Sequence, residues 1–462
     1  MISVQSRLLR LNGSSSAVFC LMLISFLACS TSKRTKKTEP PVPPKTEEKV
    51  RVYDPVSGTY ILVPRDAVKV DTIKWSEDPA VPIISDKETK DDHPITKSRY
   101  DISLLVPFNS DHYFIFGDQT DPKLNRFLQY YAGMKIASEE FETAGNSISI
   151  HSYDPGASTI ELENILKTYP IKNSDVIVGP YEKEHIKEVA EFGLKNEKIV
   201  VSPWLPAFTI EKENPFFIQA VPGLTTHAAA IMDYISDEYR GKKVYLVARN
   251  NPGEINRLQF FKKNSHVKTE DLIVDDRSMA LQRTNLSTLL DDQGTIFILP
   301  YYSRSDEAFV NSFMRKLHAD KETKEVIVFG LPQWTSFNNL NANYMESLSV
   351  HISSSAFVDV DHPSYKDFRT RFFNEFHTLP DQQAFIGYDL LKWLGKTLTE
   401  KGPSGLISGT SFGNYGMATG FDIKPVFKSA ALKPSEMKVP LYYENTRVRI
   451  LKYINQDFSV AK

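Results

Sequence analysis

Small polar and aromatic residues follow the ends of several apolar runs that are predicted to be β-strands. The runs end on Pro or Gly, and the residues after them carry hydroxyl, amide or aromatic side chains. In a parallel sheet the carboxyl ends of the strands share one edge, and a ligand crevice lies outside that edge. Helix N-termini there present unpaired N–H groups, which suit a carboxylate or another anion. The candidate ligand-binding residues are Asn109, Ser110, Tyr181, Ser202, Trp204, Tyr301, Gln333 and Trp334.

The stretch SDVIVGPY, residues 174–181, illustrates this pattern. Its apolar residues predict a buried strand, and a polar helical run begins directly after it. Gly179 lets the backbone approach a ligand closely, while Pro180 removes a donor and fixes φ. Each such turn is also explained by ordinary strand punctuation. The aromatic residues of this set either line a crevice or fill it.

Motifs of catalysis and metal binding are missing or misplaced. The sequence GTSFG at 409–413 fits G-x-S-x-G, but it lies in a Gly/Ser loop rather than between a strand and a helix. No P-loop, G-x-G-x-x-G or H-E-x-x-H motif occurs. Asp359 and Asp361 lack the spacing of a calcium loop, and His351 is expected in the core. We therefore expect no enzyme, no metal and no cofactor.

Strands and helices alternate from Tyr100 onwards, which predicts an α/β fold. Near-continuous Val and Ile runs such as DVIV and KIVV are typical of parallel strands that are covered on both faces. Helix starts are marked by Asp121-Pro122 and by the capping pair Ser158 and Glu161. The alternation runs for about 350 residues, which is too long for one compact sheet and indicates two lobes.

The composition is that of a soluble globular protein. Of 462 residues, 41% are apolar and 24% are charged, and the net charge is −2. The charge does not favour nucleic acid as a partner. No apolar run reaches the roughly 18 to 20 residues that a membrane span needs.

The N-terminus carries the pattern of a secretory signal. Arg7 and Arg10 precede the apolar run 17–28, which ends at Cys29. The residues FLAC resemble a bacterial lipobox, so Cys29 is the expected lipidation site and 1–28 the lipoprotein signal peptide. Cys20 is a rival, but bulky Phe19 precedes it. A plain signal peptide that happens to contain a cysteine is the alternative.

The segment 29–49 contains four prolines and mixed charges, which predict a disordered tether. By resemblance to lipoproteins, Ser30 rather than Asp implies sorting to the outer membrane. The absence of an acidic cluster after Cys29 favours the periplasmic face. Residues 50–98 are expected to form a small β element and a linker, because VRVY and YILV flank the turn-forming DPVSGT.

Several motifs occur in the order seen in type I periplasmic-binding proteins, the leucine/isoleucine/valine-binding and receptor ligand-binding group. They are ISLLVPF, AGMKIASEEF, SYDPGAS, DVIVGPY, IVVSPW, NPFFIQAVP and AFIGYDLLKWLGKTL, within residues 99–455. The resemblance implies two Rossmann-like lobes with parallel sheets, joined by three crossovers and closing on a small ligand. It places lobe 1 at 99–222 plus about 360–405, and lobe 2 at 223–359 plus about 406–462.

The chain departs from the amino-acid binders of that group at one strand end. Those proteins carry a small hydroxyl residue shortly after Gly-Pro, whereas this chain has Tyr181 and Glu182. Ser202 matches the serine at the next strand end. The leading hypothesis is a lipid-anchored binder of a small solute, either an amino acid or a muropeptide-like fragment. The alternative is a structural or regulatory envelope lipoprotein, resembling penicillin-binding-protein activators, that uses this fold for contacts with an envelope protein.

Overall fold

The computed structural model describes the backbone of 49–54 and 59–64, and then 96–108, 122–156, 158–205, 210, 212–263, 265–275, 280–408, 416–428 and 439–461. The chain divides into two compact units, Met1–Lys90 and Asp91–Lys462. Within the described residues, no helix combines the length and the apolar character that crossing a membrane requires.

The first unit contains a β-hairpin. Strand β1 (Lys49–Asp54) pairs antiparallel with β2 (Thr59–Pro64), and Asp54 lies opposite Thr59. Turn formers between two β-rich runs predict this hairpin, and the structure contains it.

The first lobe of the second unit is built on a seven-stranded sheet. Its strand order is β13-β14-β7-β6-β5-β3-β4, and all neighbours are parallel except β13 and β14. The strands are β3 (Arg99–Leu105), β4 (Ser147–Tyr153), β5 (Val176–Val178), β6 (Ile199–Ser202), β7 (Phe217–Gln219), β13 (Ile423–Val426) and β14 (Tyr442–Asn445).

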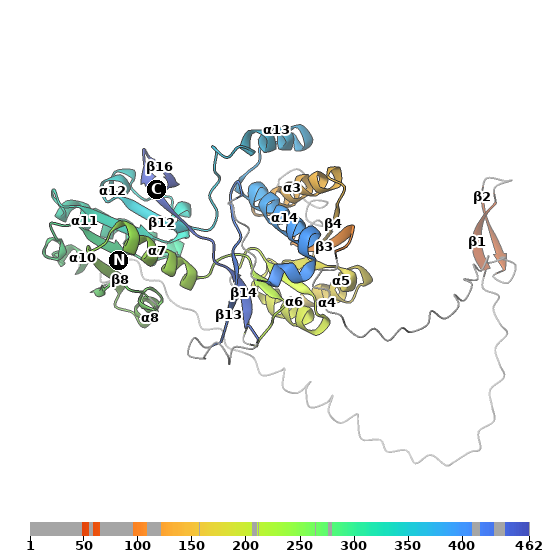
Figure 1. Cartoon of the computed structure of the whole chain (residues 1–462), viewed down its shortest axis with the longest axis horizontal. Coiled ribbons are helices and arrows are strands. Elements are labelled where there is room, and N and C mark those ends of the chain that lie inside the picture. The colour runs from red at the N-terminus through yellow and green to blue at the C-terminus, as the bar shows by residue number, and fades with distance from the viewer. Residues whose placement is uncertain are drawn as a thin grey trace, which may run out of the picture. The chain divides into compact units, whose positions relative to one another are not determined.

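Helices cover both faces of this sheet (Figure 1). They are α3 (Pro122–Thr143), α4 (Thr159–Leu166), α5 (Tyr169–Asn173), α6 (Lys183–Asn196), α14 (Gln382–Lys401) and the 3₁₀ helix η5 (Pro403–Ile407). Helix α13 (Tyr365–Phe376) packs on α3 and α14. Val176 and Val178 pack in one core with α3 and α14, while Ile177 packs in another with α4 and α6. Successive strand side chains point to opposite faces, so the apolar run fills two cores.

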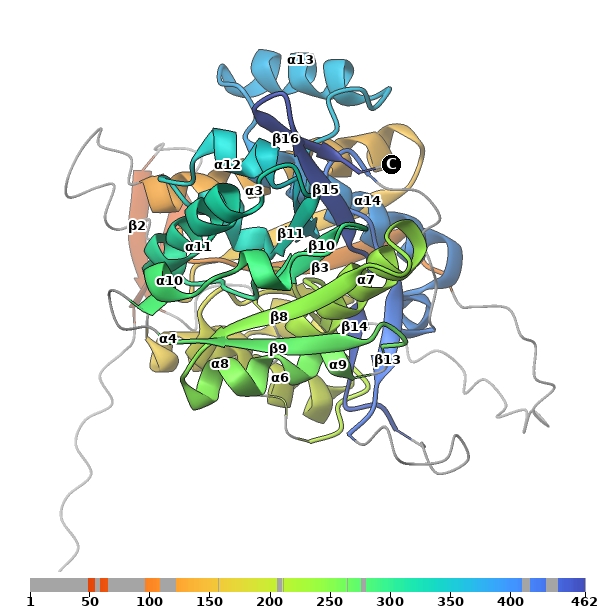
Figure 2. The same cartoon turned by 90° about the vertical axis from the view of Figure 1, so that its left-hand side faces the viewer.

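The second lobe repeats this plan around a sheet of order β16-β15-β12-β11-β10-β8-β9 (Figure 2). In this sheet β15 pairs antiparallel with both of its neighbours, β12 and β16. Its strands are β8 (Lys243–Arg249), β9 (Thr269–Val274), β10 (Thr295–Ile298), β11 (Val326–Gly330), β12 (Val350–Ser354), β15 (Arg449–Ile454) and β16 (Asp457–Val460).

The helices of the second lobe again lie on both faces of its sheet. They are α7 (Leu224–Glu238), α8 (Pro252–Arg257), α9 (Gln259–Lys262), α10 (Ala280–Arg283), α11 (Glu307–Asp320) and α12 (Ala342–Ser347), with 3₁₀ helices η2 (Ser287–Leu289), η3 (Arg304–Asp306) and η4 (Pro332–Ser336). Leu246 packs with α7, and its neighbour Val247 packs with α11. The predicted two-lobe α/β class is therefore the observed one.

The chain passes between the two sheets at residues 220–223, 355–364 and 446–448. The predicted third crossing near residue 405, with 406–462 in the second lobe, is wrong. Strand β14 pairs with β7, and β13 pairs with β14, so both belong to the first sheet. Among the described strands of this stretch, only β15 and β16 join the second lobe. Strand β14 takes its place by pairing with β7, more than 200 positions away, and local sequence patterns do not report such a pairing.

Candidate functional site between the lobes

Two predicted residues of the first lobe, Tyr181 and Trp204, pack with Phe127 and Tyr130 of α3, and we define these four residues as the aromatic cluster. The Trp204 ring lies 4.8 Å from the Tyr130 ring and 5.9 Å from the Tyr181 ring, between ring centroids. Phe127 lies 4.7 Å from Tyr181 and 5.8 Å from Trp204. The cluster packs against the α3 and α14 core, so these aromatics cover the ends of β5 and β6.

Ser202 does not face a crevice. It is fully buried, and its hydroxyl donates a hydrogen bond to the Leu205 carbonyl at 3.1 Å. The Tyr181 hydroxyl accepts a hydrogen bond from Arg126 Nη1 at 3.1 Å, at the surface. Ser202 therefore holds the turn after β6 rather than offering a hydroxyl to a ligand.

Tyr301 is a core residue of the second lobe. It has no exposed surface, and its hydroxyl donates to Glu254 Oε2 at 3.0 Å and accepts from the Arg249 backbone N–H at 3.1 Å. Arg249 pairs with Glu254 at 2.5 Å and also with Asp306. Burial alone would raise the pKa of Glu254, but the hydrogen bonds from Arg249 and Tyr301 lower it. This network of ion pairs connects the end of β8 to the segment that follows β10.

Trp334 is buried as well, and its Nε1 donates to the Tyr301 carbonyl at 3.0 Å. Gln333 is exposed on η4. The described contacts thus gather the predicted residues into two groups, Tyr181 with Trp204 in one lobe and Tyr301 with Trp334 in the other. Asn109, Ser110, Cys29 and the 409–413 motif lie outside the described residues.

A pocket of about 680 Å³ lies between elements of the two lobes. The second lobe contributes apolar side chains from η4, α12, β15 and β16, and the first lobe contributes the first two turns of α14. The apolar lining includes Trp334, Phe337, Met345, Ile386, Leu451, Tyr453 and Phe458. Ser354, Ser355, Gln382, Gln383 and Asp457 are polar groups in the lining. Such a mixture is typical of small-molecule sites. We call this space the interlobe pocket.

Local hydrogen bonds fix the α14 end of the interlobe pocket. Asp381 caps the helix, since its Oδ1 accepts from the backbone N–H groups of Gln383 at 2.7 Å and Ala384 at 3.3 Å. The Gln382 side chain donates to the Ala356 carbonyl at 3.2 Å and so joins α14 to the second crossing. The helix cap and the hydrogen bond from Gln382 therefore fix the start of α14 beside the second crossing.

A second, smaller cavity of about 60 Å³ adjoins the crossings. Its lining comes from α3, α14, the first and second crossings and two neighbouring segments: Tyr130, Pro203, Ala220, Val221, Ser355, Ala356, Ile386, Leu390, Thr419 and Phe421. Ser355, Ala356 and Ile386 also line the interlobe pocket. We call this space the hinge cavity.

One buried carboxylate holds residues 417–419, the segment that pairs with the second crossing. Asp389 of α14 accepts backbone N–H groups of Met417 at 3.1 Å, Ala418 at 2.7 Å and Thr419 at 2.9 Å. The Ala418 carbonyl in turn accepts from the Phe357 N–H at 2.8 Å. Burial raises the pKa of Asp389 to about 6, although these N–H groups oppose the rise. Asp389 thus links α14 to the crossing.

Comparison with known families gives the fold an identity. A model of the receptor family ligand binding region matches residues 141–410, which is more than half of the chain. The chain belongs to this family. Its fold is that of the type I periplasmic-binding proteins, so the family resemblance stated from sequence is confirmed.

Solved structures support the fold at low identity. A Rhodospirillum rubrum protein described as a branched-chain amino acid ABC transporter is 12% identical with a TM-score of 0.54, covering 79% of this chain and 100% of its own. A branched-chain amino acid ABC transporter periplasmic ligand-binding protein from Burkholderia xenovorans is 12% identical with a TM-score of 0.51, covering 79% and 94%. An ABC transporter substrate-binding protein from Sphaerobacter thermophilus is 12% identical with a TM-score of 0.50, covering 79% and 96%. No curated protein matches the chain.

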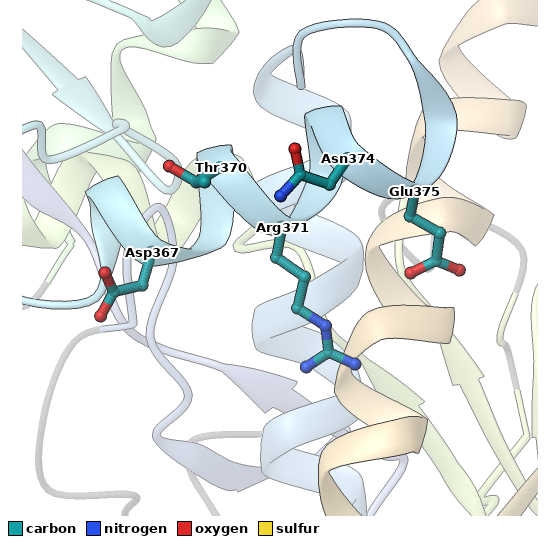
Figure 3. Close-up of a pocket in the computed structure, with 5 residues that line it drawn as sticks. All are labelled: Asp367, Thr370, Arg371, Asn374 and Glu375. Atoms are coloured by element: carbon teal, nitrogen blue, oxygen red, sulfur yellow. The ribbon is translucent and has the colours of Figure 1, made fainter.

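A wide, shallow groove runs along α13 of this receptor-family chain (Figure 3). It is lined by Asp367, Thr370, Arg371, Asn374 and Glu375. Arg371 points toward α3, where it pairs with Glu139 at 2.6 Å, and Glu375 pairs with Lys135 at 2.6 Å. These charges attach α13 to α3, so the groove is a by-product of helix packing rather than the candidate site.

Sequence reasoning missed most of the interlobe pocket of this receptor-family member. Of its described lining residues, Trp334 alone was among the predicted ones. One usable signal was the pair of glycines Gly133 and Gly387. A Cβ at Gly133 would lie 1.9 Å from the Ala384 carbonyl oxygen, and one at Gly387 would lie 2.1 Å from the Tyr130 carbonyl oxygen. These glycines therefore mark where α14 approaches α3 and brings its N-terminus to the pocket.

Proposed function

We propose that this chain is a non-enzymatic binding protein of the bacterial cell envelope that holds a small solute in the interlobe pocket. The observation that carries the proposal is the pocket itself, which has about 680 Å³ of space and walls from both lobes. A ligand that touches both walls stabilises one arrangement of the lobes over others, which is how binding proteins of this fold respond to their ligands.

The lining favours a solute with an apolar body and few polar groups. Trp334, Phe337 and Met345 offer apolar contact on one side, and Gln383 and Ser355 offer hydrogen bonds near the crossing. Among the described lining residues, Asp457 carries the one carboxyl side chain and would favour an amine. An amino acid with an apolar side chain or a muropeptide-like fragment of the cell wall fits this description.

The family membership supports the same class of function. The structural neighbours from Burkholderia xenovorans and Sphaerobacter thermophilus are described as ligand-binding and substrate-binding proteins. We further propose that the chain is anchored by lipid at Cys29 and lies at the outer membrane, facing the periplasm. We propose neither a nucleic-acid partner nor a cofactor.

The test is a thermal-shift screen of amino acids and muropeptides on the full chain. A solute at one hundred times its Kd should raise the free energy of unfolding by about 2.7 kcal/mol. Gln383→Ala should reduce the shift, while Gln259→Ala, on an exposed position of α9, should leave it unchanged. A shift that both variants leave intact would place the ligand elsewhere.

A scaffold without a small ligand is the second candidate. It is favoured by the packing of Tyr181 and Trp204 against the core of the first lobe and of Tyr301 in the core of the second, because these aromatics were expected either to line a crevice or to fill it. In that case the fold would serve contacts with an envelope protein, as in penicillin-binding-protein activators. A screen in which no solute shifts the melting temperature, together with capture of an envelope protein by crosslinking, would favour this candidate.

A further inference from the structure

Two hydrogen-bond donors are buried near one another, and one of them belongs to Tyr130, which lines the hinge cavity. The Tyr130 hydroxyl and Trp204 Nε1 have no hydrogen-bond partner among the described residues, and both atoms are shielded from solvent. Tyr130 has no exposed surface and is part of the cavity lining. The two rings pack at 4.8 Å, and Trp204 directly follows the lining residue Pro203.

An unpaired buried polar group is costly, about 1 to 3 kcal/mol, so such groups usually have a partner in the functional state. The hinge cavity is large enough to hold one, since its 60 Å³ exceeds the roughly 10 to 15 Å³ that a water molecule requires. Two such groups from different elements, α3 and the turn after β6, therefore indicate a place built for a polar group.

We infer that the hinge cavity is the inner end of the interlobe site, where Tyr130 and Trp204 donate hydrogen bonds to one uncharged acceptor oxygen of the ligand. This inference rests on the proposed function. The two spaces adjoin, because Ser355, Ala356 and Ile386 line both. A ligand with its apolar body against Trp334 and Phe337 would thus direct its acceptor past Ile386 toward Tyr130.

The two buried donors require a hydrogen-bond acceptor as the partner group of the ligand. The indole N–H is a donor only, and it cannot pair with another donor. Burial raises the pKa of Tyr130 well above its usual range, so its hydroxyl keeps its proton and can donate. An amide or other carbonyl oxygen accepts from both groups at once.

The same lining disfavours a carboxylate. Among the described residues around the hinge cavity, all are apolar or uncharged and none is Lys or Arg. A buried anion without a cation or several donors loses more hydration energy than two hydrogen bonds return. The site should therefore prefer an amide, such as a peptide carbonyl or an N-acetyl group, to a free carboxylate of the same shape.

The experiment uses the tryptophan indoles as reporters in the full chain labelled with ¹⁵N-tryptophan. The sequence contains four tryptophans; Trp334 lines the interlobe pocket and Trp393 is in the core of the first lobe. The indole resonance of Trp204 is assigned with Trp204→Phe. The probes are 4-methylpentanamide and 4-methylpentanoate, which share one skeleton and differ in charge.

We expect the amide to move the Trp204 and Trp334 indole resonances together, with saturation, while Trp393 stays in place. The carboxylate should bind at least about tenfold more weakly. Tyr130→Phe should weaken binding of the amide by about tenfold, as expected for a lost hydrogen bond. Tyr131→Phe on the same helix is the matched control and should bind like the unchanged chain.

The outcomes separate this inference from the proposed function. If the amide moves Trp334 but not Trp204, the interlobe pocket binds a solute and the inference about the hinge cavity is wrong. If Trp204 moves but Tyr130→Phe binds equally well, or the carboxylate binds as tightly as the amide, the assignment of an uncharged acceptor is overturned. If neither probe moves either resonance, the inference is overturned, and the proposed function then depends on the thermal-shift screen alone.

Discussion

Glu444 of strand β14 in the first lobe accepts a hydrogen bond from the backbone N–H of Gly223 at 2.7 Å, immediately before helix α7 of the second lobe. The same carboxylate oxygen accepts from the Thr226 hydroxyl at 2.6 Å. A carboxylate at a helix N-terminus meets unpaired N–H groups and the positive end of the helix dipole. One buried side chain therefore joins the first crossing to the strand that leads into the third.

Replacing Glu444 should destabilise the protein through this junction. Glu444→Ala removes a charged acceptor from two donors, and we expect a loss of about 2 to 3 kcal/mol in the free energy of unfolding. Glu444→Gln keeps one acceptor oxygen and should lose less. Denaturant unfolding at pH 7 measures both, with Glu191→Ala, at an exposed position of α6 in the first lobe, as a control. Equal stability of Glu444→Ala and the unchanged chain would contradict this role.

Asp389 should make the stability of the second unit depend on pH. Burial raises its pKa from the usual 3.8 to about 6. Between these two values the folded state binds more protons than the unfolded state, so stability is fully present below about pH 4 and is lost as the pH rises through 6. The loss attributable to this residue is about 3 kcal/mol.

The variant Asp389→Asn tests this dependence, because it keeps an acceptor oxygen for the N–H groups of residues 417–419 and removes the titration. Unfolding free energies measured from pH 4 to pH 7 should fall less steeply for Asp389→Asn than for the unchanged chain. Asp422→Asn, at a partly exposed carboxylate of the same lobe, provides the control. Parallel profiles for Asp389→Asn and the unchanged chain would show that Asp389 is ionised across this range.

The strands were predictable because their chemistry is local. The run VIV at 176–178 alternates between two cores, so every position is apolar, and this signal does not depend on the rest of the chain. The membership of β13 and β14 was not predictable in the same way. Pro425 and the polar YYEN give these short strands no strong pattern, and their place is decided by the pairing of β14 with β7 and of β13 with β14.

The directions in which side chains point at strand ends could also not be predicted from the sequence. Tyr301 and Tyr302 are adjacent and chemically identical, yet Tyr301 is buried against Glu254 and Tyr302 is 48% exposed. A step of one residue reverses the side-chain direction, and the ion network of Arg249 decides which tyrosine enters the core. The interlobe pocket likewise depends on segments far apart in the chain, such as η4, α14 and β15, which meet only after folding.

The N-terminal anchor remains a prediction from sequence. Mass spectrometry of the mature protein should find a diacylated or triacylated cysteine at Cys29, because the apolar run 17–28 ends there on Ala28. Cys29→Ser should move the protein out of the membrane fraction, and Cys20→Ser should not. A Cys29→Ser protein that stays in the membrane fraction would contradict the anchor.

Tyr301 should contribute to folding rather than to binding. Its hydroxyl lies between the Glu254 carboxylate and the Arg249 N–H, so Tyr301→Phe leaves both without this partner and should reduce the free energy of unfolding by about 1 to 3 kcal/mol. Tyr302→Phe, one residue later and exposed, should change it by less than about 0.5 kcal/mol. Denaturant unfolding measures stability, and titration with a solute from the thermal-shift screen measures affinity.

The contrast between the two measurements decides the role of Tyr301. If it is a core residue, Tyr301→Phe lowers the unfolding midpoint but binds the solute with an unchanged Kd, because the interlobe pocket is lined by other side chains. If Tyr301→Phe weakens binding by tenfold or more and unfolds at the same midpoint, its hydroxyl faces the ligand in the closed protein. The ion network at the ends of β8 and β10 would then open on binding, and the site would extend into the second lobe beyond Trp334.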